Sequence, residues 1–344
     1  MPKTIKHEFD KCLTFKKMLE AHERAKVGKS NKSEIIIFEM DLENNIIKII
    51  DDIKYNRYKF GEYREFKVYE PKERIIKSLP YRDRIVHQWF VEEFIKPYYY
   101  PRFINDTYAC LDLRGTHKAV ESLQIKMRKM QKKHNEYYVL KCDIRKYFYS
   151  IDKNILIKIL SKKISDKKVL NFAKVILNDG VDIGIPIGNY TSQYFANIYL
   201  NELDHFVKEE LRVKNYIRYM DDFIILVKEK EEARKLYYII QNFINSRLNL
   251  QFNSKSSYFK SRKGIDFCGY RIYETHILLR KRFKNKVNKS IRTWNYLYNN
   301  NKLYYDKFIM SWNSYKGHAS HSNSFNFISN KSKKIICLNT NETK

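Results

Sequence analysis

Three aspartates occupy positions where carboxylates could hold a metal ion. Asp143 ends the run 137–144, whose β-branched and aromatic residues predict a buried strand. Asp221 and Asp222 stand between two short apolar runs, a pattern that predicts a β-hairpin with acids at its tip. Adjacent carboxylates at a tight turn repel each other unless a cation is present. Carboxylates from different strands are ligands that Mg²⁺ prefers, so the pattern predicts a divalent-metal site.

Such a site would suit phosphoryl transfer. Two metal ions a few ångströms apart can activate an attacking hydroxyl and stabilise the phosphate that leaves. The alternative for Asp221-Asp222 is a solvated turn, since Asp is a common turn former. The residues that flank the acids must decide between these two interpretations.

The charge of the chain favours a polyanionic partner. The 344 residues carry a formal charge of +28, and nucleic acid or an anionic membrane surface would complement it. Enrichment of Lys through genome composition is the alternative source of that charge. The five cysteines form no CxxC pair, which argues against a zinc or redox site. No apolar run is long enough to cross a bilayer, so we expect a cytoplasmic protein without a membrane partner.

The elements that would position these acids alternate between helices and short strands. A glycine-rich turn is expected over 180–189, directly before a long helix. The segment from about Ser329 is polar and is predicted to be disordered. Helices are expected after Asp41, over Asp83–Phe94 with an end before Pro97, after Lys153, and over Thr191–Val207; strands are expected near 66–69, 257–259 and 266–272.

The residues around the three aspartates resemble reverse transcriptases. Tyr219-Met220-Asp221-Asp222, with its apolar flanks, resembles the catalytic hairpin of that family. The segment 143–152 resembles the first palm motif, and 184–197 resembles the next one. The motifs occur in the order of the family, and the resemblance covers about residues 10–325. Order of this kind is more specific than any single motif.

The resemblance assigns the catalytic residues. Asp143, Asp221 and Asp222 would bind two Mg²⁺ ions, with Mn²⁺ as an alternative, and the carbonyl of Ile144 would also face a metal. Lys255 stands where the family has a lysine that can protonate the departing pyrophosphate.

It also assigns the nucleotide-binding residues. Lys72 and Arg74 would clamp the triphosphate, although single basic residues are common in so basic a chain. Phe148 occupies the position of a steric gate that rejects a ribose 2′-hydroxyl; ordinary core packing is the alternative. Ile187 and Gly188 lie in the glycine-rich turn, where the backbone could closely approach the template–nucleotide pair.

Two segments would hold the nucleic acid. The turn made by Phe267, Cys268, Gly269 and Tyr270 resembles the primer grip, with a structural strand corner as the alternative. The segment 275–305 has eight Lys or Arg and no acid, which predicts either a helix facing phosphates or a solvated surface. Its candidate contacts are Arg280, Lys281, Arg282 and Lys284.

The fold that the resemblance implies is an α+β right-hand polymerase, with fingers, a palm built on a small antiparallel sheet, and a helical thumb. We expect an N-terminal helical segment at 1–66, fingers at 67–136, a palm with finger elements at 137–275, and a basic helical thumb and tail at 276–344. The substrates would be an RNA template, a DNA primer and dNTPs. The resulting near-A-form hybrid is recognised by its shape and backbone.

Within the family, three features favour the branch that serves diversity-generating retroelements, encoded by bacteria or phages. The first is the pair of segments 108–110 and 115–117. The second is the Ile-Gly-Asn…Ser-Gln form of the glycine-rich motif over 187–193, and the third is the segment 314–319. Related retron and group II intron enzymes usually have Gln at position 187 and Pro at 193, where this chain has Ile187 and Gln193. The branch implies a small basic accessory protein as partner. The alternatives are an antiphage reverse transcriptase, a group II intron- or retron-like one, and a non-catalytic RNA-binding protein.

Ile187 leads to a hypothesis about fidelity. An aliphatic side chain offers no hydrogen bond to the nascent base pair, so a polar check of about 1 kcal/mol would be lost. We therefore expect an error-prone enzyme, with errors opposite adenine if the branch is correct. The alternative is that Ile187 only packs under the glycine-rich turn.

Overall fold

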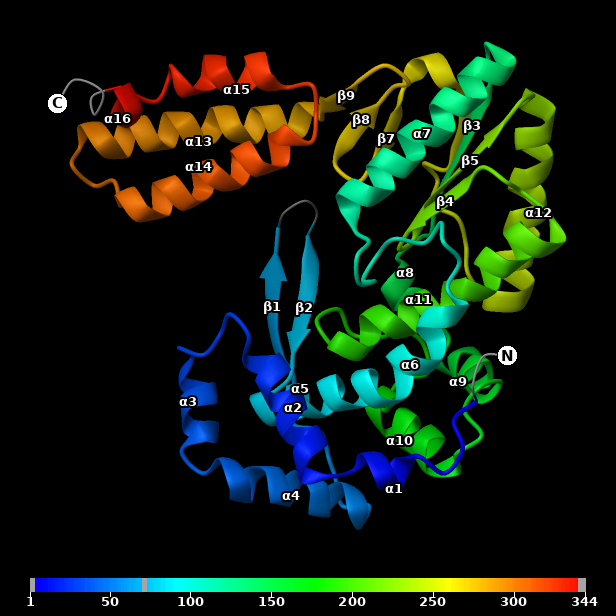
Figure 1. Cartoon of the computed structure of the whole chain (residues 1–344), viewed down its shortest axis with the longest axis vertical. Helices are drawn as coiled ribbons and strands as arrows, with labels where there is room; N and C mark the ends of the chain where they lie inside the picture. Colours follow the sequence, from blue (N-terminus) through cyan, green and yellow to red (C-terminus); the bar gives the residue numbers. More distant parts are fainter. Residues whose placement is uncertain (1–3, 70–72, 340–344) are drawn as a thin grey trace. The chain divides into compact units, whose positions relative to one another are not determined.

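The computed structural model describes residues 4–69 and 73–339. They form two compact units, each assembled from several stretches of sequence (Figure 1). The first unit comprises 1–112, 142–223 and 236–256, and the second comprises 113–141, 224–235 and 257–344. These units cut the chain differently from the fingers, palm and thumb expected above, so the boundaries of those lobes stay predictions.

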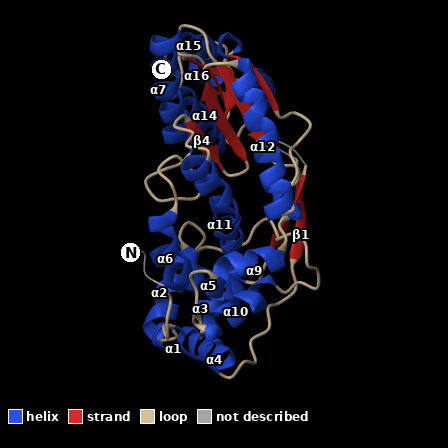
Figure 2. Cartoon of the chain, turned by 90° about the vertical axis from the view of Figure 1, so that its right-hand side faces the viewer, coloured by secondary structure: helices blue, strands red, loops and turns tan. Residues whose placement is uncertain are grey.

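Helices make up most of the first unit (Figure 2). Three of them begin at a side chain that caps the first turn: Thr14 accepts from the backbone of Lys17, and Asp152 and Asp166 each accept from two backbone N–H groups. The helices are α1 (Phe9–Cys12), α2 (Phe15–Lys26), α3 (Ser33–Glu39), α4 (Leu42–Lys54), α5 (Tyr81–Phe90), α6 (Lys96–Tyr99), α8 (Tyr147–Ser150), α9 (Lys153–Ser161), α10 (Lys167–Leu177), α11 (Tyr190–His205) and most of α12 (Lys230–Leu248).

Aromatic packing holds α5 in the core of this unit. Trp89 and Phe90 are fully buried, and the ring of Trp89 lies edge-on to those of Phe9 and Phe94 at 5.7 and 5.2 Å. Phe172 of α10 closes the cluster at 5.7 Å from Trp89. Rings in such arrangements add about 0.5–1.5 kcal/mol per pair beyond the area they bury.

The predicted end of α5 before Pro97 is wrong. The helix starts at Tyr81, continues as a π-helix over Val91–Ile95, and leads directly into α6. The N–H of Lys96 donates to the carbonyl of Val91, which is the i→i+5 pattern of a π turn. Pro97 then stands in the first turn of α6, where a missing N–H costs nothing.

Two antiparallel strands form an exposed hairpin. Strand β1 (Arg64–Val68) pairs with β2 (Arg74–Ser78), in a register that sets Arg64 opposite Ser78 and Val68 opposite Arg74. The strand expected at 66–69 is therefore confirmed, two residues earlier. The hairpin belongs to the first unit.

A four-stranded sheet carries the predicted catalytic hairpin. Its order is β4 (Tyr216–Tyr219), β5 (Asp222–Val227), β3 (Tyr138–Asp143) and β6 (Ser257–Lys260). Strand β5 is buried from Phe223 to Val227, as its unbroken apolar run predicts for a strand covered on both faces. Strand β3 pairs antiparallel with β6, with Tyr138 opposite Lys260. The strand and the hairpin predicted from sequence are both confirmed.

The second unit contains a smaller sheet and a helical bundle. Strands β7 (Ile265–Phe267), β8 (Tyr270–Ile272) and β9 (Ile277–Leu279) form an antiparallel sheet, and α7 (Thr116–His134) packs against β8. The strand predicted at 266–272 is therefore two strands with a turn between them. Helices α13 (Lys281–Asn299), α14 (Tyr305–Ser320), α15 (Phe325–Ser332) and α16 (Ile336–Asn339) form the bundle (Figure 1).

The disorder predicted from Ser329 is also wrong for the residues that the structure describes, which extend to 339. Ile335 is fully buried and Cys337 is 2% exposed, in a core with Val287 of α13 and Trp312 of α14. Leu338 packs against the same core, so a few apolar side chains dock this polar segment; a fully buried Ile alone stabilises by about 1.5–3 kcal/mol.

Candidate active site

The tip of the β4–β5 hairpin presents the tandem acids. Met220 and Asp221 connect the strands, and Met220 adopts a left-handed backbone with φ of 56°. Asp222 already begins β5, so its side chain and that of Phe223 point to opposite faces of the sheet.

Asp143 is held in place at the end of β3 by a second loop. Asn253 donates from Nδ2 to Oδ2 of Asp143 at 3.0 Å, and its backbone N–H donates to the carbonyl of Asp143 at 2.7 Å. Ser256 accepts from the backbone N–H of Asp143 at 3.0 Å. Three hydrogen bonds thus fix both the backbone and the carboxylate of Asp143.

Backbone pairing joins Asp143 to the hairpin tip. The N–H of Ile144 donates to the carbonyl of Asp221 at 3.3 Å, while Ile144 also bridges to Phe252. The pKa of Asp221 is consequently raised to about 6. Burial is the largest cause, followed by the charge of Asp143 and, more weakly, by that of Asp222. Arg74 opposes this shift from the β1–β2 hairpin.

These acids fit a divalent cation. A carboxylate whose pKa is raised by burial and by a neighbouring carboxylate gains most from a bound positive charge. Within 4–69 and 73–339, however, no three His, Cys, Asp or Glu side chains gather as a metal-binding group. Asp143 and Asp221 form the electrostatically coupled pair, and Mg²⁺ commonly uses one or two carboxylates plus substrate phosphates. The assignment of Asp222 as a third ligand stays a prediction.

A buried ion pair supports the hairpin from below. Arg218 and Asp204 are both 0% exposed; Nε and Nη2 of Arg218 donate to the two carboxylate oxygens at 2.7 and 2.5 Å. Nη1 of Arg218 donates to the carbonyl of Met220 at 2.9 Å, which ties the pair to the turn itself. Asp204 also accepts from the hydroxyls of Thr107 and Tyr216, both at 2.7 Å. Every charge in this network is paired, so it can hold the tip rigidly.

Phe148 lies on α8, directly after the first palm motif. Its ring is half-buried, and its carbonyl accepts from the N–H of Ile185 in the glycine-rich turn at 2.8 Å. The neighbouring Tyr147 is buried and donates to the carbonyl of Ala196 at 2.5 Å, which anchors α8 to α11. The sequence-predicted gate residue is therefore a fixed and partly exposed ring, not a fully buried core residue.

The glycine-rich turn packs against strand β2. Gly188 has a φ of 132°, and a Cβ there would lie 2.3 Å from the carbonyl of Lys77, so only glycine fits. The N–H of Lys77 donates to the carbonyl of Ile187 at 2.9 Å. The side chain of Ile187 is half-buried. The turn and the β1–β2 hairpin thus form one structure that carries both Arg74 and Ile187.

Of the remaining residues predicted to act on the nucleotide, the structure describes Arg74 and Lys255. Lys72 lies outside the described residues. Arg74 is exposed on β2 and lies close enough to Asp221 to affect its pKa. Lys255 is exposed in the turn that follows Asn253, where its backbone N–H donates to Oδ1 of Asn253 at 3.2 Å. The loop that orients Asp143 therefore also carries Lys255.

The predicted primer grip is the β7–β8 turn of the second unit. Cys268 and Gly269 both have positive φ, 46° and 93°, which is the geometry of a two-residue hairpin turn. Phe267 and Tyr270 are 0% exposed, so their rings belong to the core. Only the turn residues Cys268 and Gly269 remain available for a primer contact, through their backbone.

The four basic residues chosen in 275–305 stand at the start of α13. Arg280 stands directly before the first turn of the helix, with its Nε 3.4 Å from Oδ1 of Asp266, and Nζ of Lys284 lies 5.8 Å from the ring centre of Phe327. Lys281 and Arg282 are exposed. The helix predicted here is confirmed, but its basic residues do not all face solvent in the same way.

Sequence reasoning missed the supporting residues Asp204, Arg218 and Asn253. Arg218 stands directly before the hairpin motif, within a run that is predicted to be a strand. An arginine buried there needs a carboxylate partner, and this was the signal for such a residue. Asp204 had no comparable signal, because it lies 14 residues away on α11. Asn253 is 110 residues from Asp143 in sequence.

Known proteins resemble this chain at the level of a family. The family model described as reverse transcriptase (RNA-dependent DNA polymerase) matches residues 67–272, which is more than half of the chain. An uncharacterized 91 kDa protein in a cob intron of Schizosaccharomyces pombe is 27% identical over 207 residues, 57% of this chain and 24% of that protein. Protein YkfC of Escherichia coli is 24% identical over 233 residues, 56% of this chain and 61% of YkfC. The chain thus spans less than two thirds of either relative.

A solved structure of telomerase from Candida albicans, in complex with a fragment of telomeric RNA, aligns with a TM-score of 0.48 and 10% identity. The alignment covers 74% of this chain and 55% of that one. No helix in the described part of this chain is long and apolar enough to cross a membrane. The family match, together with the α+β architecture and the carboxylate hairpin, is what identifies the fold. The chain belongs to the reverse transcriptase family, and its residues 67–272 form an RNA-dependent DNA polymerase domain with the right-hand polymerase fold.

Proposed function

We propose that this protein copies an RNA template into cDNA by nucleotidyl transfer with two Mg²⁺ ions, which Mn²⁺ could replace. The single observation that carries the proposal is the coupling of Asp143 and Asp221, whose pKa is raised to about 6. Two carboxylates kept together, with the pKa of Asp221 still raised in spite of the charge of Arg74, suit a cation site better than a solvated turn. In such a site, bound metal ions would lower the pKa of the primer hydroxyl and neutralise charge on the phosphates.

The residues of the chain then take distinct roles. Asp143, Asp221 and Asp222, with the carbonyl of Ile144, would hold the metals, while Asn253 keeps the carboxylate of Asp143 in one orientation. We assign Lys255 to the proton that the departing pyrophosphate takes up.

The incoming nucleotide would lie between the β1–β2 hairpin and α8. Arg74, and Lys72 by the family pattern, would bind its triphosphate. Phe148 would contact the sugar, and Gly188 would let the backbone of the turn approach the base pair. The primer would contact the backbone of Cys268 and Gly269. The phosphates of the nucleic acid would contact the exposed cations of α13.

Primer extension tests this proposal directly. The substrate is a DNA primer annealed to a defined RNA, with dNTPs and Mg²⁺. We expect full-length cDNA, its loss when a chelator is added, and its return with excess Mg²⁺. Binding of the primed template without extension under any metal would instead support the alternative, a non-catalytic RNA-binding protein.

We further propose that the enzyme is error-prone and serves a diversity-generating retroelement. The supporting observation is Ile187, which is half-buried in the glycine-rich turn and has no polar atom with which to check a base pair. In that branch the template is a repeat beside a variable gene, and a small basic protein is the partner. Antiphage defence and a retron- or intron-like role are the alternatives, with the same chemistry.

The test compares the wild type with Ile187→Gln on one RNA template by sequencing the cDNA. We expect frequent errors opposite adenine in the wild type, and several-fold fewer in the variant if the amide restores about 1 kcal/mol of discrimination. A low error rate opposite adenine in the wild type would reject both the fidelity hypothesis and the retroelement role. It would leave the polymerase assignment intact.

A further inference from the structure

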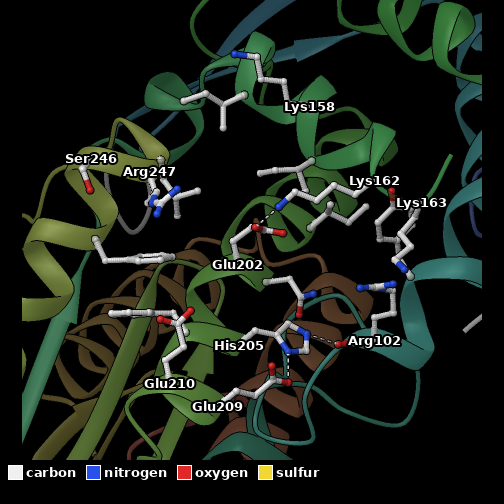
Figure 3. Close-up of a pocket in the computed structure, with 18 residues that line it drawn as sticks. Arg102, Lys158, Lys162, Lys163, Glu202, His205, Glu209, Glu210, Ser246 and Arg247 are labelled. Atoms are coloured by element: carbon white, nitrogen blue, oxygen red, sulfur yellow. Dashed lines mark hydrogen bonds and ion pairs between the residues drawn. The ribbon is translucent and has the colours of Figure 1, made fainter. Parts of the chain in front are cut away.

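A cavity opens on the first unit, and none of its lining residues belongs to the candidate active site. Its volume is about 1000 Å³. Side chains from α9, α11, the π-helix Phe206–Glu210 that continues α11, and α12 surround it, together with Arg102 (Figure 3). A cavity of this size could enclose a ligand as large as a nucleotide.

Two buried polar atoms in the wall have no hydrogen-bond partner within the described chain. They are Oδ1 of Asn201, whose side chain lies in a residue only 7% exposed, and Nη1 of Arg102. A buried polar group left unpaired costs about 1–3 kcal/mol, so a molecule that reached these two atoms would gain by donating to Asn201 and accepting from Arg102.

The charges around the cavity leave a positive surplus. Five Lys or Arg side chains line it against three glutamates, of which Glu202 is paired with Lys162 at 2.5 Å and Glu209 lies 2.6 Å from Nδ1 of His205 (Figure 3). Among the described residues, no ion pair involves three further cations of the lining. These cations are Lys158, Lys163 and Arg247. An anionic ligand would neutralise them.

An aromatic wall completes the site. Phe206 and Phe243 stack with ring centres 4.0 Å apart and an interplanar angle of 10°, and both remain half-buried. Flat rings next to cations and unpaired hydrogen-bonding groups are the combination by which proteins hold the unstacked bases of single-stranded RNA.

We propose that this cavity binds one nucleotide of a single-stranded RNA segment. The base lies against Phe206 and Phe243 and donates an N–H to Asn201, and its phosphate accepts from Arg102 and the neighbouring lysines. The inference rests on the proposed function, since the RNA would be part of the transcript that the enzyme copies. It gives that RNA a second contact, through which the enzyme could select its own template.

Charge reversal at the exposed rim tests the proposal without disturbing the core. The variant is Lys158→Glu with Lys163→Glu, and the matched control is Lys167→Glu with Lys174→Glu on α10, outside the cavity. The probe is a fluorescent, unprimed 20-nucleotide RNA, measured by anisotropy at 150 mM salt. We expect about tenfold weaker binding in the variant and less than twofold in the control, because only the variant loses specific phosphate contacts. Equal losses in both would overturn the proposal.

Crosslinking identifies the occupant independently of affinity. RNA that contains 4-thiouridine should crosslink to peptides with Phe206 or Phe243, and Asn201→Leu should reduce that crosslink several-fold while the protein keeps its wild-type Tm. Crosslinks confined to other peptides would reject the site. A poly-glutamate peptide that abolishes the crosslink at the same concentration as RNA would instead assign the cavity to an acidic protein segment.

The outcome can be separated from that of the proposed function. Extension of a short primed template at saturating concentration should be unchanged in the Lys158/Lys163 variant, since neither residue belongs to the polymerase site. If the wild type fails to extend primers but crosslinks through Phe206 or Phe243, the polymerase proposal fails and the RNA site stands. If it extends primers but gives no such crosslink, the reverse holds.

Discussion

The first unit brings aspartates together and the second brings histidines together, and the pKa values of the two groups shift in opposite directions. In the first unit, burial and the charge of Asp143 raise the pKa of Asp221 to about 6. In the second, burial and the charges of its neighbours lower the pKa of His318 below its usual value. Its ring stacks on Tyr270 at 4.6 Å, and the rings of His117 and His321 stack at 3.4 Å. Asp221 is therefore ionised at neutral pH at a cost, whereas the lowered pKa values of His117 and His318 favour their neutral forms.

The difference lies in what the protein itself provides. The hydroxyl of Tyr270 lies 3.3 Å from Nε2 of His117 and 3.2 Å from Nδ1 of His318, so neutral imidazoles find a partner within the fold. Asn253 gives Asp143 a hydrogen bond but no positive charge. A cluster satisfied internally explains itself by packing. A cluster that still needs a countercharge indicates a ligand, and this distinguishes the candidate active site from the histidine cluster.

The largest effect should come from Asp221→Asn. Loss of a metal-binding carboxylate should reduce primer extension by at least about 1000-fold, while the affinity for primed template stays within about twofold, because affinity comes from distributed cations. Asp222→Asn should also abolish extension. Asp112→Asn, which changes an exposed aspartate of the same unit, is the matched control and should keep full activity.

The same variant should be more stable than the wild type without metal. Since the folded-state pKa of Asp221 is raised, the contribution of this residue to the stability of the metal-free wild type is greatest below the usual Asp pKa and is lost as pH rises through about 6. At pH 7.5 with chelator, Asp221→Asn should gain about 1–2 kcal/mol in urea unfolding, after allowance for solvent screening. Loss of activity with loss of stability would mean that Asp221 is structural and that the comparison with the histidines fails.

The buried pair Asp204–Arg218 differs from both the aspartates and the histidines, because its opposite charges neutralise each other within the protein. Arg218→Met removes one partner and leaves the carboxylate of Asp204 buried without a cation, which should cost about 3–5 kcal/mol of unfolding free energy. Urea unfolding at pH 7.5 measures this loss. Lys162→Met, which breaks an exposed pair with Glu202, should change stability by less than about 1 kcal/mol. Equal effects would show that the network under the hairpin tip contributes nothing special.

The parts of this site that could be predicted from sequence are those whose residues lie close together in the chain. The acids, Phe148 and the glycine-rich turn were located because each motif is local and the motifs keep their order. The partners of Arg218 and Asp143 were not, since Asp204 and Asn253 reach them only after folding. The docking of Ile335 into the helical bundle was missed for the same reason.

A smaller effect should appear in the pH dependence of the histidine cluster. Because the folded-state pKa of His318 is lowered, its contribution to stability is present above the unfolded pKa of about 6.5 and is lost as pH falls. His318→Gln removes the titration and keeps a polar side chain. The fall in unfolding free energy between pH 7 and 5 should then be shallower, by less than about 1.4 kcal/mol per pH unit, the limit for one proton. An unchanged slope would show that His318 does not titrate on unfolding.

The smallest effect should distinguish two cations at the start of α13, Lys281 and Lys284. Lys284 lies over the ring of Phe327, as Arg280 lies beside Asp266, so both have partners within the second unit. Lys281 is exposed and would lose less by turning to phosphates. Lys281→Gln should therefore flatten the slope of log affinity against log salt by about 0.7–0.9, the value for one lost contact. Lys284→Gln should flatten it less.

The measurement is the affinity for primed template at 50–400 mM salt. If both variants shift the slope equally, internal partners do not decide which cations bind nucleic acid. If neither variant shifts it, the start of α13 is a solvated face whose charge makes no contact with phosphates.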